Sequence, residues 1–155
     1  MEIEVKNVKF VEAFSEETFC FTASIRVDGK KVGEASNRGR GGNTDLMYKD
    51  GYPHKSETHK AIKEYCETLP PMEDEYFPDG LKYNPEFLIY ELVCKEYERQ
   101  QNKKMCRGQT AYRMPNYEYE TEDTYHIRKE KFTPTVREQL KFRYGEGVYI
   151  LNEHI

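Results

Sequence analysis

The segment Ser36–Asn43 places three glycines and two arginines, Arg38 and Arg40, within a few residues of one another. Glycine tolerates a positive φ and lets the backbone approach another surface closely, and the planar guanidinium of arginine suits carboxylate or phosphate groups. One interpretation is an anion site in which backbone N–H groups form a nest. The other is a flexible hairpin exit that its charges keep soluble. We predict that this segment contacts a ligand or partner through Arg38, Gly39, Arg40, Gly41, Gly42 and Asn43.

This glycine–arginine segment indicates a place of contact and no particular reaction. It lacks the Gly-Lys-Ser/Thr sequence of a phosphate loop, and no strong helix begins at its end, so the helix dipole would not assist an anion there.

A second candidate contact surface is the run Tyr117, Glu118, Tyr119 and Glu120, in which tyrosines alternate with glutamates. As a strand, the run would present an aromatic face that anchors a basic partner and an acidic face that steers it. As a loop, it would be a mobile surface segment without an apolar anchor. The acidic triplet 73–75 would enlarge the same negative surface, although charge runs are usually just solvated.

Side chains able to hold a metal or perform catalysis are present, but their spacing is poor. A metal site needs two histidines on one helix face, but His54 precedes the helix predicted from residue 57 and need not share a face with His59. We expect His59 at the rim of the core, hydrogen-bonded to the backbone. Cys66 lies two helical turns from His59, about 10 Å away, and Cys20 could meet His126 only if their strands pair. We therefore expect no metal and no cofactor, and the sequence favours a binding protein over an enzyme. A small hydrolase with a site assembled across the fold remains an alternative.

Composition bounds the class of protein. The chain has 155 residues, a net charge of −4, 14% aromatic residues, 13 tyrosines and no tryptophan. This length fits one domain over residues 1–155, and the tyrosine excess favours a contact surface. The first 50 residues carry a net charge of −1, the next 50 of −5 and the last 55 of +2. This balance argues against a general polyanion binder, which would be basic.

The same composition suggests a cytoplasmic protein. No apolar run approaches the length of a membrane span, and the first residues lack the pattern of a signal peptide. None of the four cysteines forms a Cys-x-x-Cys pair, so we expect buried thiols that act as small hydrophobic side chains.

Apolar periodicity and turn residues predict an α+β fold with a mostly antiparallel sheet, made of an N-terminal β-hairpin and C-terminal strands and packed against two or three helices. The hairpin turn is Asp28–Gly29, and Ser56, Asn84 and Thr133 are expected to cap helices. Segments 43–55 and 70–83 are expected to be irregular. The predicted strands are 2–11, 17–27, 31–35, 109–114, 123–132 and 148–151, and the predicted helices begin at about 57, 85 and 134.

The stretches Ser15–Gly42 and Phe132–Glu153 resemble segments of small uncharacterised proteins that phages and other mobile elements encode. This resemblance contains no catalytic motif. It implies a bacterial setting and a protein that blocks host machinery, as anti-CRISPR proteins do. The leading hypothesis is thus a non-enzymatic inhibitor that docks on a protein or nucleoprotein. The alternative is a phosphate, nucleotide or nucleic-acid binder that uses Arg38 and Arg40.

Overall fold

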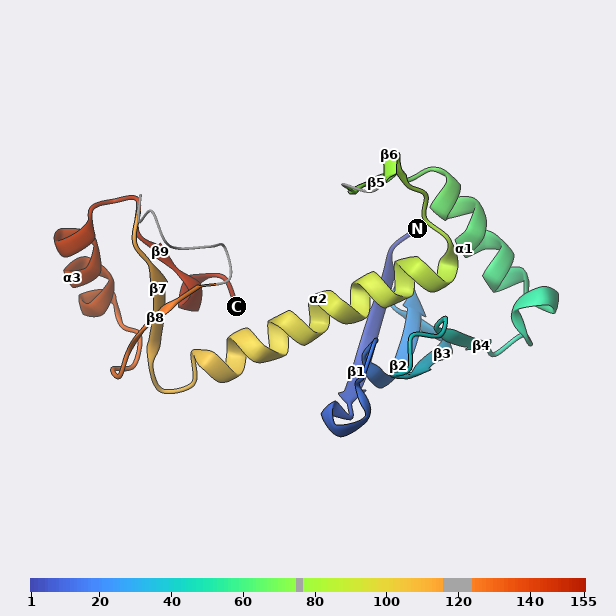
Figure 1. Cartoon of the computed structure of the whole chain (residues 1–155), viewed down its shortest axis with the longest axis horizontal. Coiled ribbons are helices and arrows are strands. Elements are labelled where there is room, and N and C mark those ends of the chain that lie inside the picture. The colour runs from blue at the N-terminus through green and yellow to red at the C-terminus, as the bar shows by residue number, and fades with distance from the viewer. Residues whose placement is uncertain (75–76, 116–123) are drawn as a thin grey trace. The chain divides into compact units, whose positions relative to one another are not determined.

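The computed structural model describes residues 1–74, 77–115 and 124–155 (Figure 1). The chain divides into two compact units, Met1–Tyr97 and Glu98–Ile155, and the division falls inside helix α2, Pro85–Met105. One domain over 1–155 stays a prediction, because compactness alone does not tell whether either unit folds by itself.

The first unit is built on a four-stranded antiparallel sheet in the order β1-β2-β3-β4. The turn between β2 and β3 is Asp28–Gly29, and both residues have positive φ, 48° and 76°, as the sequence predicted. A two-stranded sheet of β5 and β6 follows α1. The bounds are β1 Ile3–Phe10, β2 Cys20–Val27, β3 Lys30–Arg38, β4 Asp45–Tyr48, α1 Glu57–Glu67, β5 Met72–Asp74 and β6 Phe77–Leu81.

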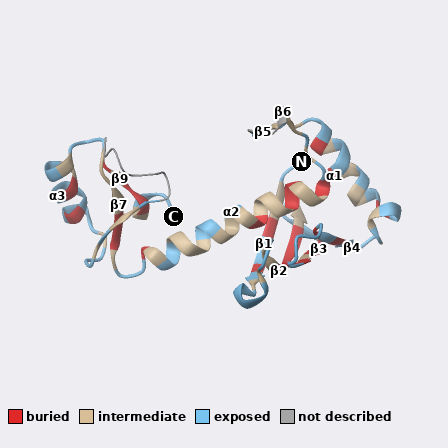
Figure 2. Ribbon diagram, viewed as in Figure 1, coloured by how far each residue is buried: buried red, intermediate tan, exposed pale blue. Residues whose placement is uncertain are grey.

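Helices α1 and the first part of α2 cover one face of this sheet (Figures 1 and 2). Alternate residues of β2, including Phe21 and Ile25, point toward the helices and are 1% and 0% exposed. The Phe21 ring lies 6.3 Å from the ring of Tyr90 on α2. Ile62 of α1 and Ile89 of α2 complete this core. The other set of alternate β2 residues is polar and lies on the uncovered face.

The helix boundaries follow the local signals in the sequence. Ser56, Asn84 and Thr133 each accept a hydrogen bond from the backbone N–H three residues further along, at 2.9, 2.8 and 3.2 Å. Gly145 ends α3 with a φ of 87°. All three predicted caps are confirmed, because capping depends on neighbours in the sequence and on little else.

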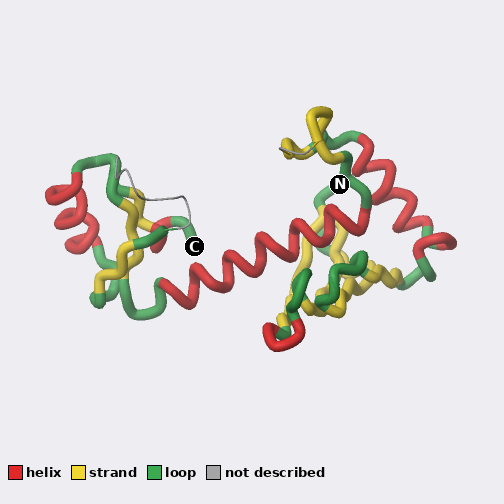
Figure 3. The backbone as a smooth tube through the Cα atoms, in the orientation of Figure 1, coloured by secondary structure: helices red, strands yellow, loops and turns green. Residues whose placement is uncertain are grey.

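The described residues of the second unit contain the end of α2, a three-stranded antiparallel sheet in the order β8-β7-β9, and helix α3 (Figure 3). Its cores are small: Val136 and Leu140 of α3 pack on Ile150, and Ala111 packs with Leu151 on the other side of the sheet. The bounds are β7 Thr110–Arg113, β8 His126–Arg128, α3 Pro134–Tyr144 and β9 Tyr149–Ile150.

The α+β class and the antiparallel pairing are confirmed, with the strands distributed over three sheets. Two expectations are wrong. Segment 43–55 contains strand β4, and segment 70–83 contains the β5–β6 hairpin. These strands are short, and pairing with a neighbouring strand defines them better than their own periodicity does.

In the part of the chain that the structure describes, no helix is both long enough and apolar enough to cross a membrane.

Candidate binding surface

The glycine–arginine segment is fixed by its backbone. Gly39 is buried, has a φ of 81°, and accepts hydrogen bonds at its carbonyl from the N–H groups of Glu16 and Glu17, at 2.9 and 3.0 Å. Its own N–H donates to Asn37 Oδ1 at 2.8 Å. A Cβ at this position would overlap the carbonyl oxygen of Phe14. Gly39 therefore holds loop 15–18 against the end of β3.

Two further polar groups of this segment have partners within the protein. The N–H of Gly41 donates to Thr18 Oγ1 at 3.3 Å, and Asn37 Nδ2 donates to the carbonyl of Gly42 at 2.9 Å. The predicted nest is therefore wrong for the Gly39 and Gly41 amides, which already have acceptors. Arg38 and Arg40 are exposed and form no ion pair with a described residue. Their role in binding stays a prediction.

The second predicted surface cannot be placed in this fold. Tyr117, Glu118, Tyr119 and Glu120 lie outside the described residues, so their contribution to binding stays a prediction.

Each histidine of the first unit contacts the ring of a neighbouring tyrosine. His59 Nδ1 lies 3.3 Å from the hydroxyl of Tyr48, a side-chain partner instead of the backbone partner that we expected. His54 stacks on Tyr52, with ring centroids 6.1 Å apart. No cluster of three or more His, Cys, Asp or Glu side chains able to hold a metal occurs among residues 1–74, 77–115 and 124–155.

Cys66 and Cys106 are buried, as the sequence predicted, whereas Cys20 and Cys94 are only half-buried. All four are free. Burial raises the pKa of Cys66 to about 11 and also raises that of Cys106, whereas a nucleophilic cysteine needs a lowered pKa. Strand β2, which carries Cys20, pairs with β1 and β3, and β8, which carries His126, pairs with β7. The proposed meeting of Cys20 and His126 through strand pairing does not occur.

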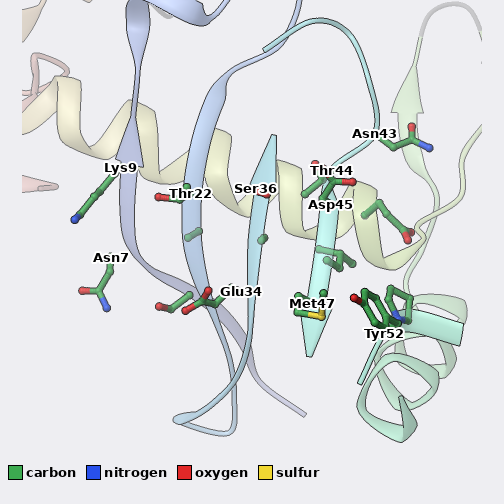
Figure 4. Close-up of a pocket in the computed structure, with 16 residues that line it drawn as sticks. Asn7, Lys9, Thr22, Glu34, Ser36, Asn43, Thr44, Asp45, Met47 and Tyr52 are labelled. Carbon is green, nitrogen blue, oxygen red and sulfur yellow. The ribbon is translucent and has the colours of Figure 1, made fainter. Parts of the chain in front are cut away.

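The uncovered face of the four-stranded sheet forms an open groove of about 890 Å³ (Figure 4). The strand register aligns Lys9, Thr22, Ser36 and Asp45 in one row across the four strands. A neighbouring row across the same strands consists of Lys6, Ser24, Glu34 and Met47.

The floor of the groove is polar and rich in hydroxyl groups. Ser24 and Thr44 are only 8% and 6% exposed, yet neither hydroxyl makes a hydrogen bond to a described residue. The Thr22 and Ser36 hydroxyls, on the row beside Ser24, likewise have no partner within the described parts of the chain. These hydroxyls reach the surface of the groove, because Arg26 Nε is the one side-chain polar atom of the described residues that is both buried and unpartnered. They are therefore available to water or to a bound molecule.

Two exposed side chains border this polar floor. Met47 of β4 is 45% exposed, and Tyr52, beyond the end of β4, is 59% exposed (Figure 4). Tyrosine and methionine are enriched at protein interfaces, and methionine adapts its shape to a partner. These side chains provide the apolar contact area that the hydroxyl floor lacks.

The charge of the groove is unevenly distributed. Glu34 is paired with Lys31 at 2.8 Å, and this hydrogen bond lowers the pKa of its carboxyl. Asp45 and Glu86 also line the groove, but they form no ion pair with any described residue. Unpaired negative charge is therefore present beside β4 and at the start of α2.

A second, smaller cavity of about 200 Å³ adjoins the groove. Asn43, Thr44 and Glu86 line both. Loop 42–44 thus forms one border of each cavity, which places predicted residues Gly42 and Asn43 at this surface. The wall of the second cavity is completed by Thr18, Asn37, Asn84, Phe87 and Tyr90.

Sequence reasoning missed most of this surface. Thr22 and Ser24 alternate with apolar residues along β2, which is the pattern of a half-buried strand, but this pattern does not show which polar residues of other strands lie beside them. That information depends on strand register, which joins residues far apart in the chain.

Comparison with known proteins yields no relative: no protein family model, curated protein or solved structure matches the chain. The chemistry of the groove is therefore the basis for a functional assignment.

Proposed function

We propose that this protein is a non-enzymatic binding protein that docks a protein partner on the uncovered face of its β1–β4 sheet. The observation that carries this proposal is the open groove of about 890 Å³, whose polar floor includes the hydroxyls of Ser24 and Thr44, neither of which has a partner among the described residues. A partner's backbone or polar side chains would satisfy them. Tyr52 and Met47 would anchor the same partner at the border of the groove.

Charge favours a protein over a nucleic acid as the occupant. Residues 1–97 carry 13 Lys and Arg against 19 Asp and Glu, a net charge of −6. Phosphate groups would meet the unpaired carboxylates of Asp45 and Glu86 in the groove, whereas nucleic-acid binding depends on cationic contacts to phosphate. The alternative of phosphate binding is supported by the exposed Arg38 and Arg40, and by Lys9, which lines the groove and forms no ion pair with a described residue.

The resemblance to phage-encoded proteins supports a partner in bacterial host machinery. An inhibitor of such machinery needs no catalytic group, because occupation of the partner's surface is sufficient. This accords with cysteine thiols whose pKa values are raised in place of lowered.

Site-specific photocrosslinking tests the proposal. The photoreactive residue p-benzoylphenylalanine replaces Met47 in the groove or, as the matched control, Phe14, which is 62% exposed in the same unit and does not line the groove. In a bacterial lysate we expect position 47 to crosslink one defined protein and position 14 to crosslink none.

Competition then separates specific docking from simple capture. An excess of unlabelled wild-type protein should abolish the crosslink, and an excess of a Thr22→Arg variant, which blocks the groove, should not. Equal competition by both, or equal crosslinking from positions 47 and 14, would contradict docking on this face. If the crosslinked species contains nucleic acid and disappears in an Arg38→Ala/Arg40→Ala variant, the phosphate-binding alternative replaces our proposal.

A further inference from the structure

We infer that the second cavity, between loop 42–44 and the start of α2, receives an arginine side chain of the docked partner. This inference rests on the proposed function and specifies the chemistry of the partner. The guanidinium would lie beside the Glu86 carboxylate, and the rest of the partner would extend over the groove.

The size and position of the cavity fit an inserted side chain. Its volume of about 200 Å³ is far larger than the roughly 10 to 15 Å³ that a single water requires. It opens beside the groove, because Asn43, Thr44 and Glu86 border both. A side chain of a segment that crosses the groove would therefore reach it.

Several hydrogen-bond donors of the cavity wall have partners within the protein. Asn37 Nδ2 donates to the Gly42 carbonyl, and the Thr18 hydroxyl donates to Asn37 Oδ1 at 3.0 Å. The N–H groups of Phe87 and Leu88, in the first turn of α2, donate to the side chain and backbone carbonyl of Asn84.

Acceptors, in contrast, remain available. The Glu86 carboxylate has no ion-pair or hydrogen-bond partner among the described residues. The Thr44 hydroxyl is equally unpartnered there and belongs to a residue that is only 6% exposed. A hydroxyl and a carboxylate without partners lie at one opening, and a charged donor would hydrogen-bond to both.

The aromatic side chains in the wall favour arginine over lysine. Phe87 and Tyr90 both line the cavity. Phe87 is held by a stacked contact with Tyr83, with ring centroids 5.2 Å apart, and the Tyr90 hydroxyl accepts the N–H of Phe19 at 3.2 Å. A planar guanidinium stacks on such rings and can also engage a carboxylate bidentately, which the ammonium of lysine cannot do.

The test uses the full chain, labelled with ¹⁵N, and N-acetyl-arginine amide as the probe, followed by NMR chemical-shift titration. We expect saturable shifts of the Gly42, Asn43, Thr44 and Phe87 amides. Glu86→Gln should weaken the probe about tenfold or more, in line with the loss of a charged hydrogen bond. The matched control Glu64→Gln, at an exposed position of α1, should leave the affinity unchanged. Thr44→Val should weaken it several-fold.

Three outcomes would overturn the inference: no saturable shifts at these amides, equal affinity for N-acetyl-lysine amide, or shifts of the same amides by inorganic phosphate. The crosslink from position 47 distinguishes the two proposals. If that crosslink persists in Glu86→Gln with undiminished efficiency and the probe does not bind, docking on the groove stands and the arginine inference fails.

Discussion

Alternate residues of β2 lie on opposite faces of the same sheet, and the two faces differ in burial, in polarity and in whether their side chains have partners within the protein. Phe21, Ala23 and Ile25 are buried under α1 and α2, whereas Thr22 and Ser24 belong to the groove. The covered face is apolar and has its partners within the protein. The groove face has hydroxyls and carboxylates whose partners are missing from the described residues.

The difference assigns the stability of the first unit to the covered face of the sheet and partner binding to the groove face. Burial of apolar area stabilises the fold, so the covered face should carry the free energy of unfolding. The groove face contributes little apolar burial, so its residues can be changed with little effect on folding. Single substitutions on the covered face should therefore lower the free energy of unfolding far more than substitutions on the groove face.

Ile25→Ala should lower the free energy of unfolding by about 2–5 kcal/mol, because it leaves a cavity in a core position that is 0% exposed. Urea unfolding followed by circular dichroism measures this change. A cost below about 1 kcal/mol would mean that the helices do not pack on this face as described.

Gly39→Ala should cost about 1–3 kcal/mol, since a non-glycine residue is strained at a φ of 81° and its Cβ would overlap the Phe14 carbonyl. Gly42→Ala is the matched control in the same segment. It has no atom within 4 Å of the added Cβ and should change the free energy of unfolding by less than about 0.5 kcal/mol. Equal effects in the two variants would show that Gly39 does not fix loop 15–18.

Asp50 should link the start of α1, and so the cover of the apolar face, to pH. Hydrogen bonds from the Ser56 hydroxyl at 2.6 Å and from the Thr58 N–H at 3.0 Å lower the pKa of Asp50 to about 2. The ordinary value in an unfolded chain is about 3.9. Because the folded-state pKa is the lower one, the stabilisation is fully present above about pH 4 and is lost as the pH falls toward about 2.

Thermal unfolding at pH 7 and at pH 2.5 measures this dependence. The difference in Tm between wild type and Asp50→Asn should be larger at pH 7 and should shrink at pH 2.5. Asp45→Asn, on the groove face, is the control, because no described residue donates a hydrogen bond to the Asp45 carboxylate. The same pH dependence in both variants would contradict a special role for Asp50.

Thr22→Ala and Ser36→Ala, on the groove face, should each change the free energy of unfolding by less than about 0.5 kcal/mol, as urea unfolding would measure. The same variants should weaken the crosslink from position 47. A destabilisation above about 1 kcal/mol would contradict the assignment of stability to the covered face, since the groove face would then contribute to folding as well.

The elements of this protein were largely predictable from sequence where local signals decide them. The alternation in β2, the Asp28–Gly29 turn and the caps Ser56, Asn84 and Thr133 all depend on residues within a few positions of one another. The strands of β4, β5 and β6 were not predictable in this way, because they are short and pairing with a neighbour defines them.

The candidate site was predictable only in part. The sequence pointed to segment 36–43, and Gly42 and Asn43 do border the second cavity. It did not predict that the Gly41 N–H donates to the hydroxyl of Thr18, because Thr18 lies on another loop. It also did not predict the local hydrogen bond from the Gly39 N–H to Asn37.

By itself, then, the sequence determined the class of the fold, the ends of its helices and the polar character of alternate residues in β2. Only the tertiary structure decided that Lys9, Thr22, Ser36 and Asp45 form one row, and that Thr44 and Glu86 border one cavity. The physical reason is the range of the interactions. Caps, turns and periodicity act between near neighbours, whereas register and helix packing join residues tens of positions apart.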